Sequence, residues 1–238
     1  MKALLVDLFG TIIPCPTRKD HRELILSMSR EAGLDPKRYE KLWGATYGDR
    51  ISGVGKDSTG FIRHMLLTKD IRPDESVLRK MAGHWDEYTR SLFVFFPDVE
   101  PAISNLRKRG IKIGLLTNCG SNVPEIFSSF EISQMFDSTI YSSSTGHVKP
   151  QMDIYTDALQ DIGSEPEQTV FIGDGDNGEL EGARDAGIFS IKIDRGEIKG
   201  DYRITDDQPW DPTIGSFDEI EGVLQSFSST KPALAQNQ

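Results

Sequence analysis

The sequence has little that would suit a secreted or membrane-bound protein. Its 238 residues include two cysteines, Cys15 and Cys119, which are too few for the disulfide framework of a small secreted protein. No apolar run approaches the roughly 18 residues that suggest a membrane-spanning helix. The first apolar stretch is too short for a signal peptide and runs straight into Asp7. We therefore expect a cytoplasmic protein with no membrane partner.

Positive charge is also scarce. The chain has 27 Lys and Arg against 37 Asp and Glu, which gives a net charge of −10 and a pI of about 4.9. An acidic chain repels phosphate backbones and anionic lipid, so we expect neither nucleic acid nor a membrane surface as a partner. A small phosphorylated ligand is compatible with this charge, because one site can be locally positive. Nothing in the sequence defines the oligomeric state.

Five short apolar runs bounded by turn residues are typical of buried parallel strands. They lie at residues 3–8, 111–116, 170–172 and 190–193, with a weaker one at 138–141. Helical patterns at 100–109, 151–162 and 178–186 alternate with them, and each is followed by a glycine. This alternation predicts an α/β fold, with a Rossmann-like parallel sheet and helices on both faces.

Residues 16–95 interrupt this alternation, because they contain no convincing buried strand. Helical patterns cover 22–32, 36–47, 59–69 and 74–92, and Asp35-Pro36 and Pro73-Asp74 are suitable helix starts. We therefore expect a core built from residues 1–15 and 96–227, and a small helical domain inserted at 16–95. Residues 228–238 are expected to form a flexible tail.

Polar residues stand where these strands end. Asp7 ends the first strand, Thr117 and Asn118 follow the second, and Asp174 follows the strand at 170–172. Lys149 comes shortly after the weak strand. In an open parallel sheet, ligands bind at the carboxyl ends of the strands, so we expect these side chains to converge in one crevice.

Such a set of side chains suits hydrolysis of an anionic substrate. Two carboxylates can hold Mg²⁺, which prefers oxygen ligands, and one of them can attack the substrate to form a covalent intermediate. Thr117 and Lys149 would then bind the oxygens of the transferring group. The turn at Gly10 would let backbone N–H groups approach the same anion.

Four motifs in this order resemble those of the haloacid dehalogenase (HAD) superfamily. Each motif alone is weak, but all four stand at strand ends over nearly the whole chain. They are Asp7-Leu8-Phe9-Gly10-Thr11, Leu115-Leu116-Thr117-Asn118, Val148-Lys149-Pro150, and Ile172-Gly173-Asp174 followed by Glu179 and Gly182-Ala183-Arg184-Asp185-Ala186-Gly187. The helical insertion at 16–95 resembles the C1 cap of this superfamily, which closes over the active site and excludes water.

The resemblance implies a role for each matching position. Asp7 matches the nucleophile, and Thr117 and Lys149 match the residues that steady it and bind phosphoryl oxygens. The implied magnesium ligands are Asp7, the backbone carbonyl of Phe9, Asp174, and Glu179 directly or through water. Gly10, Thr11 and Asn118 are expected to contact the substrate.

Phe9 departs from the pattern of the phosphatases, which carry a second aspartate there as general acid. The dehalogenase branch has an aromatic residue at this position, and its second motif is close to Thr117-Asn118. Asp174 and Glu179 favour a metal site, whereas that branch works without metal. We therefore rank a Mg²⁺-dependent phosphatase of a small phosphorylated metabolite first. A metal-independent dehalogenase-like enzyme is second, and a non-catalytic HAD scaffold that binds a ligand or partner is third.

The inserted helical region offers side chains that could select the substrate. Arg18 and Arg50 could meet a substrate anion, although exposed arginines are more often solvated. Its aromatic residues are expected to be mainly core packing, with one or two facing the substrate. Cys15 is expected to be a small apolar filler.

Overall fold

A single parallel sheet forms the centre of the molecule. The computed structural model describes residues 1–196 and 209–230. The strands lie in the order β3-β2-β1-β4-β5-β6, and every neighbouring pair is parallel. Their bounds are β1 Ala3–Val6, β2 Lys112–Thr117, β3 Ser138–Tyr141, β4 Thr169–Gly173, β5 Phe189–Ile193 and β6 Thr213–Ile214. The chain order reverses beside β1, so ligands are expected at the carboxyl ends of β1 and its neighbours.

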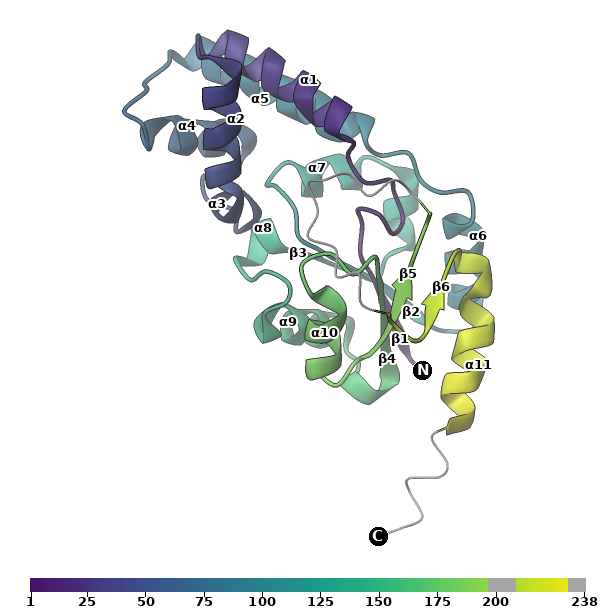
Figure 1. Ribbon diagram of the computed structural model, residues 1–238. Coiled ribbons are helices and arrows are strands. Elements are labelled where there is room, and N and C mark those ends of the chain that lie inside the picture. Colours follow the sequence, from purple (N-terminus) through teal and green to yellow (C-terminus); the bar gives the residue numbers. More distant parts are fainter. Residues whose placement is uncertain (197–208, 231–238) are drawn as a thin grey trace.

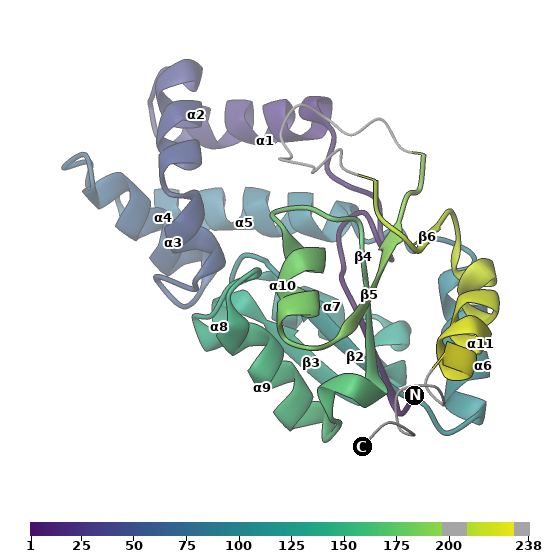
Figure 2. The same ribbon diagram turned by 60° about the horizontal axis from the view of Figure 1, so that its bottom comes forward.

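Helices cover both faces of this sheet (Figures 1 and 2). On one face, α6 (Val99–Lys108) and α11 (Ile220–Thr230) pack on Leu4 and Val6 of β1. On the other face, α9 (Met152–Ile162) and α10 (Glu179–Asp185) pack on Ala3 and Leu5 of the same strand. Because side chains alternate along a strand, one short apolar segment supplies both layers of core.

The helical region has a hydrophobic core of its own. It contains α1 (Arg18–Glu31), α2 (Pro36–Ala45), α3 (Tyr47–Ile51), α4 (Ser58–Leu67) and α5 (Glu75–Ser91). Its buried side chains form one cluster that includes Met28, Tyr39, Phe61, Met65 and Trp85. It lies beyond the carboxyl edge of the sheet (Figure 1).

Polar contacts fix the helical region against the sheet domain at two places. The amide of Asn122 donates to Asp86 (3.1 Å) and to Thr89 (2.9 Å) on α5. The hydroxyl of Ser142 donates to the carbonyl of Ile51 over 2.6 Å. The region therefore stands over the crevice at the strand ends rather than to one side of it.

The structure agrees with most of the predicted elements and differs at several boundaries. The strand predicted at 3–8 ends at Val6, and the helix predicted at 36–47 ends at Ala45 and is followed by a separate short helix, α3, that was not predicted. Four further elements were not predicted: α7 (Val123–Ser128), α8 (Ser142–Thr145), the short β6 and α11. The first three are too short to show periodicity. The tail expected at 228–238 begins inside α11, and its residues 231–238 lie outside the described part of the chain.

Among the described residues, no helix is long and apolar enough to cross a membrane.

Candidate active site

Asp7 stands at the centre of the carboxyl edge of the sheet. It directly follows β1, and its backbone N–H donates to the carbonyl of Ile172 on β4 over 2.9 Å. Only 5% of its surface is exposed. Burial of an ionised carboxylate requires a partner, so the side chains around Asp7 decide what it can do.

Lys149 is that partner. Its Nζ lies 2.6 Å from Oδ1 of Asp7 and 2.5 Å from Oε2 of Glu179. Burial alone would lower the pKa of Lys149, but the two carboxylates outweigh burial and raise it. Lys149 is therefore a permanent positive charge in the crevice, as predicted from its place after the third strand.

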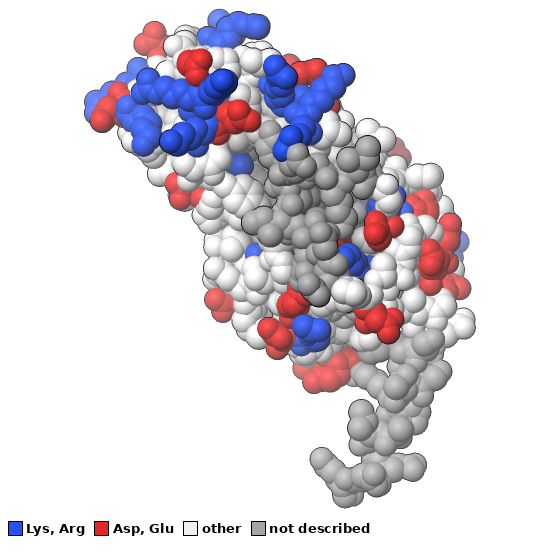
Figure 3. All heavy atoms as spheres, in the orientation of Figure 1, with Lys and Arg blue, Asp and Glu red and all other residues white. Residues whose placement is uncertain are grey.

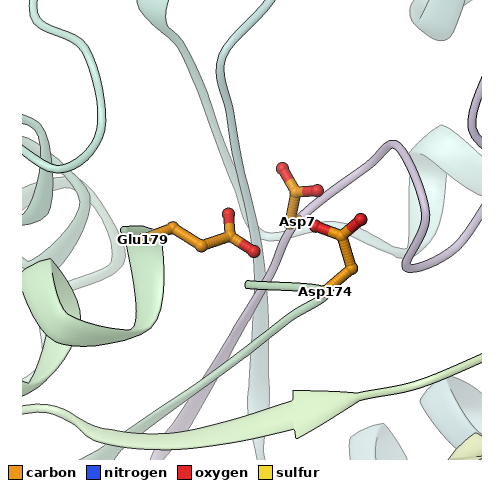
Figure 4. Close-up of side chains that lie close together, drawn as sticks. All are labelled: Asp7, Asp174 and Glu179. Atoms are coloured by element: carbon orange, nitrogen blue, oxygen red, sulfur yellow. The ribbon is translucent and has the colours of Figure 1, made fainter. Parts of the chain in front are cut away.

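A cluster of three buried carboxylates surrounds this ammonium. One oxygen from each of Asp7, Asp174 and Glu179 lies within 4.8 Å of the others. Figure 4 shows the three side chains pointing toward one another from β1, the end of β4 and the start of α10. Burial raises the pKa of Glu179, and the ammonium of Lys149 opposes this shift. One ammonium cannot neutralise three carboxylates, so the cluster favours an additional cation.

The residues present fit a hard divalent cation. All three acidic side chains offer oxygen ligands, and they come from rigid strand ends and a helix start. Gly10 leaves the space beside them open: a Cβ there would lie 2.4 Å from Oδ2 of Asp174, and its φ of +79° also disfavours other residues. These observations meet the chemical requirements of a Mg²⁺ site.

Two buried hydroxyl groups near this cluster have no hydrogen-bond partner in the described part of the chain. They are Oγ1 of Thr11 and Oγ1 of Thr117, and both residues are fully buried. Thr117 ends β2, next to β1. Because unpaired buried polar atoms are uncommon, the two hydroxyls are candidates for ligand contacts.

Asn118 ties the end of β2 to the loop that carries Lys149. Its Oδ1 accepts from the backbone N–H of Lys149 over 2.8 Å, and its Nδ2 donates to the Lys149 carbonyl over 3.0 Å. Asn118 also lines the cavity described below. The two hydrogen bonds of Asn118 thus hold Lys149 in place. The sequence had predicted only a substrate contact for Asn118.

The sequence did not reveal several other supporting contacts. The thiol of Cys15, predicted to be an apolar filler, lies 3.7 Å from Oδ2 of Asp174. The hydroxyl of Tyr155 donates to the carbonyl of Glu179 over 2.7 Å. The guanidinium of Arg195 donates to the carbonyl of Thr11 over 2.8 and 3.1 Å. These contacts depend on side chains reaching between distant elements, and no local pattern signals them.

A cavity of about 590 Å³ joins the acidic cluster to the helical region. Its sheet side is lined by Asp7, Phe9, Lys149 and Glu179, and its helical side by aromatic residues and Arg50. Cys119 also lines it, but burial raises the pKa of this thiol to about 12, so it is not a nucleophile at neutral pH. The volume suits a small metabolite.

Known proteins resemble this chain in sequence and in fold. A glyceraldehyde 3-phosphate phosphatase of Methanopyrus kandleri is 29% identical over 236 residues, which cover 96% of this chain and 99% of the relative. A 2-haloacid dehalogenase of Pseudomonas syringae has a TM-score of 0.68 and 19% identity, and the match covers 95% of this chain and 100% of that one. A HAD-family enzyme of Bacteroides thetaiotaomicron, solved as a magnesium complex, has a TM-score of 0.64 and 19% identity, covering 84% and 96%.

The family model of the haloacid dehalogenase-like hydrolases matches residues 1–187. This match spans β1, the helical region and all the strand ends that supply the acidic cluster. The chain belongs to the haloacid dehalogenase-like hydrolases.

Proposed function

We propose that this hydrolase is a Mg²⁺-dependent phosphatase of a small phosphorylated metabolite, with Asp7 as its nucleophile. The observation that carries the proposal is the buried cluster of Asp7, Asp174 and Glu179, with Lys149 against Asp7. A site for an uncharged substrate would not need such a concentration of charge. The M. kandleri relative, named for its action on a small phosphate ester, supports the same substrate class.

In the proposed reaction, Asp7 attacks phosphorus and the bond from phosphorus to the leaving oxygen breaks. An aspartyl-phosphate forms on Asp7, and water then attacks its phosphorus, releasing inorganic phosphate and restoring the carboxylate. Lys149 orients Asp7 and, with the hydroxyl of Thr117, binds the phosphoryl oxygens. The backbone at Gly10 and Thr11 borders the same anion, and Asn118 keeps Lys149 in position.

The proposed magnesium ligands are Asp7, the carbonyl of Phe9, Asp174 and Glu179. Bound Mg²⁺ would offset the repulsion among the carboxylates and the negative charge of the substrate. Glu179 also accepts hydrogen bonds from Lys149 and from the N–H of Gly175 (3.0 Å), so it links the metal site to the phosphate site.

We also propose that residues 16–95 act as a cap. The cavity lies between these helices and the strand ends, so they enclose the substrate and supply the side chains that select it. Their own hydrophobic cluster makes them a packed unit of their own.

Phosphate release from p-nitrophenyl phosphate tests this function. The wild-type enzyme should release phosphate in the presence of Mg²⁺. The rate of Asp7→Asn should be lower by about a thousandfold or more, because the amide is not a nucleophile. Thermal unfolding of the variant would show that the fold is retained. Activity that persists in EDTA or in Asp7→Asn would contradict the proposal.

Phe9 favours a second candidate, a dehalogenase-like attack of Asp7 on carbon without metal. An aromatic side chain here lines the cavity and cannot transfer a proton. We rank this candidate lower because a reaction without metal assigns no role to the carboxylates of Asp174 and Glu179. Halide release from short 2-haloacids, measured without metal in parallel with phosphate release, separates the two reactions.

A further inference from the structure

Arg50 brings a positive charge into the cavity from the helical region. It belongs to α3 and lines the same cavity as Asp7 and Lys149. Its Cζ lies 4.2 Å from the centroid of the Trp43 ring and 5.3 Å from that of Tyr47. Stacking on aromatic rings fixes the plane of the guanidinium without neutralising its charge.

The described residues use little of the hydrogen-bonding capacity of Arg50. A guanidinium has five N–H donors, and within the described part of the chain the side chain of Arg50 donates one hydrogen bond, from Nη1 to the carbonyl of Trp43 over 2.9 Å. Within residues 1–196 and 209–230, no carboxylate forms an ion pair with it. A rigid, unpaired cation facing a cavity is arranged to accept an anion from solution.

Two other described titratable residues that line this end of the cavity, Glu40 and His21, do not form an ion pair with Arg50. Glu40 lines the cavity but is exposed at its rim. Burial lowers the pKa of His21, and the charge of Arg50 lowers it further, so this imidazole is neutral at pH 7. Burial also lowers the pKa of Arg50 to about 10, and the guanidinium still stays charged at neutral pH.

We infer that Arg50 binds a carboxylate at the end of the substrate remote from the phosphate. This inference rests on the proposed phosphatase function and narrows its substrate class to small phosphomonoesters that carry a carboxylate. A carboxylate matches the fork of a guanidinium with two parallel hydrogen bonds. The phosphate itself is placed at the other end, where Lys149 lies beside the nucleophile.

A pair of substrates with the same three-carbon skeleton tests this assignment. Their far ends differ: 3-phosphoglycerate has a carboxylate, whereas glycerol 3-phosphate has a hydroxymethyl group. The wild-type enzyme should prefer 3-phosphoglycerate in kcat/KM by about tenfold to a hundredfold, the range for a charge-assisted hydrogen-bonded pair. Glyceraldehyde 3-phosphate, which also lacks the carboxylate, should behave like glycerol 3-phosphate.

Arg50→Gln should reduce this preference to near unity, mainly through a higher KM for 3-phosphoglycerate. Arg50→Lys keeps the charge but loses the fork, so its preference should be intermediate. Arg63→Gln is the matched control: Arg63 lies on α4, pairs with Glu75 at 2.7 Å and does not line the cavity. It should keep the full preference. A purely structural Arg50 would lower turnover of both substrates together.

Equal wild-type turnover of the two substrates would overturn the inference, as would a preference that survives in Arg50→Gln. Binding is measured separately in Asp7→Asn, by the rise in melting temperature with each substrate and Mg²⁺, and needs no turnover. If the wild-type enzyme releases no phosphate from any substrate, the proposed function fails. In that case the carboxylate site would still be supported if 3-phosphoglycerate raises the melting temperature of Asp7→Asn more than glycerol 3-phosphate does, and if this difference disappears in Asp7→Asn/Arg50→Gln.

Discussion

The side chains at the carboxyl edge are held in a state of unbalanced negative charge. Asp7, Asp174 and Glu179 are all buried, and Lys149 contacts only the first and the last of them. Removing one partner of a buried charge pair commonly costs about 3–5 kcal/mol. The site is therefore sensitive to any change in charge, including the binding of a cation.

Glu179 should make the stabilising effect of Mg²⁺ depend on pH. In the folded, metal-free protein its pKa is raised above the ordinary value of 4.5. The unfolded chain therefore loses this proton at a lower pH than the folded protein does. As a result, the free energy of unfolding decreases as the pH rises above about 4.5. Mg²⁺ binds the ionised carboxylate and competes with the proton. The rise in melting temperature caused by Mg²⁺ should thus be larger at about pH 8 than at about pH 6.

Glu179→Gln provides the control for this effect, because it removes the titrating group and keeps its size. Its Mg²⁺-dependent rise should be smaller and should vary less with pH. A wild-type rise that is equal at both pH values would mean that Glu179 does not exchange a proton for the metal.

Phe9 should make the reaction depend on the acidity of the leaving group. No acid stands at this position, so an alkoxide must leave without help, whereas a nitrophenolate leaves readily. Phe9→Asp should raise turnover of alkyl phosphates relative to p-nitrophenyl phosphate by about tenfold or more, within the range of general acid catalysis. Phe9→Leu should keep the wild-type ratio. Similar wild-type rates for alkyl and aryl phosphates would show that another group donates the proton.

Asp7, Asp174 and Lys149 could be predicted from the sequence, because each follows a parallel strand, directly or through a loop, whereas Glu179 was expected from the resemblance of its motif. The structure brings Asp7, Lys149, Asp174 and Glu179 together as expected. The roles of Cys15, Tyr155 and Arg195 could not be predicted, since their contacts join elements far apart in the chain.

At the scale of elements, the crevice is built by linking strand ends to loops. Asn118 joins β2 to the Lys149 loop through two hydrogen bonds, which involve the backbone on both sides of Lys149. These two hydrogen bonds, called the Asn118 clamp below, determine where the ammonium of Lys149 lies relative to β1. A change here should therefore affect catalysis more than folding.

Asn118→Ala should lower kcat by about tenfold or more, because a small displacement of a positioning group costs about this much. Its free energy of unfolding should fall by only about 1–3 kcal/mol, the cost of leaving two backbone groups unpaired. Asn105→Ala is the matched control, because Asn105 is remote from the cavity lining and bonds the exposed Glu221 over 2.7 Å. Unchanged kcat in Asn118→Ala would show that the loop holds Lys149 without the clamp.

Long periodic elements were predictable, and short ones were not. The strands around β1 and the helices α6, α9 and α10 follow from apolar runs and glycine stops. The helix α3 was not predicted, because its five residues are too few to show periodicity. Arg50 lies on this short helix, and contacts with Trp43 orient its side chain.

At the scale of the whole molecule, charge is unevenly distributed. Residues 16–95 contain 15 Lys and Arg and 12 Asp and Glu, although the chain as a whole has a net charge of −10. Figure 3 shows Lys and Arg gathered over the helical region and Asp and Glu spread over the sheet domain. The exposed Arg22 and Lys41 are next in sequence to His21 and Glu40, which line the cavity. An anion should therefore approach from the helical side.

Reversal of these two charges should slow capture of the substrate. Arg22→Glu/Lys41→Glu should lower kcat/KM at least about twofold at low salt, and the difference should fade near about 0.5 M NaCl as screening shortens the reach of charge. Lys69→Glu/Arg72→Glu makes the same change at exposed residues that do not line the cavity, and should have little effect. A loss that persists at high salt would point to a direct contact instead.

Under the proposed function, Asp7 becomes phosphorylated during turnover. The most direct measurement uses a substrate with a radioactive phosphoryl group, mixed with excess enzyme and quenched in acid within one turnover. We expect label on the protein that requires Mg²⁺, maps to the peptide containing Asp7 and is absent in Asp7→Asn. Phosphate release with no label on the protein, or label that survives in Asp7→Asn, would contradict it.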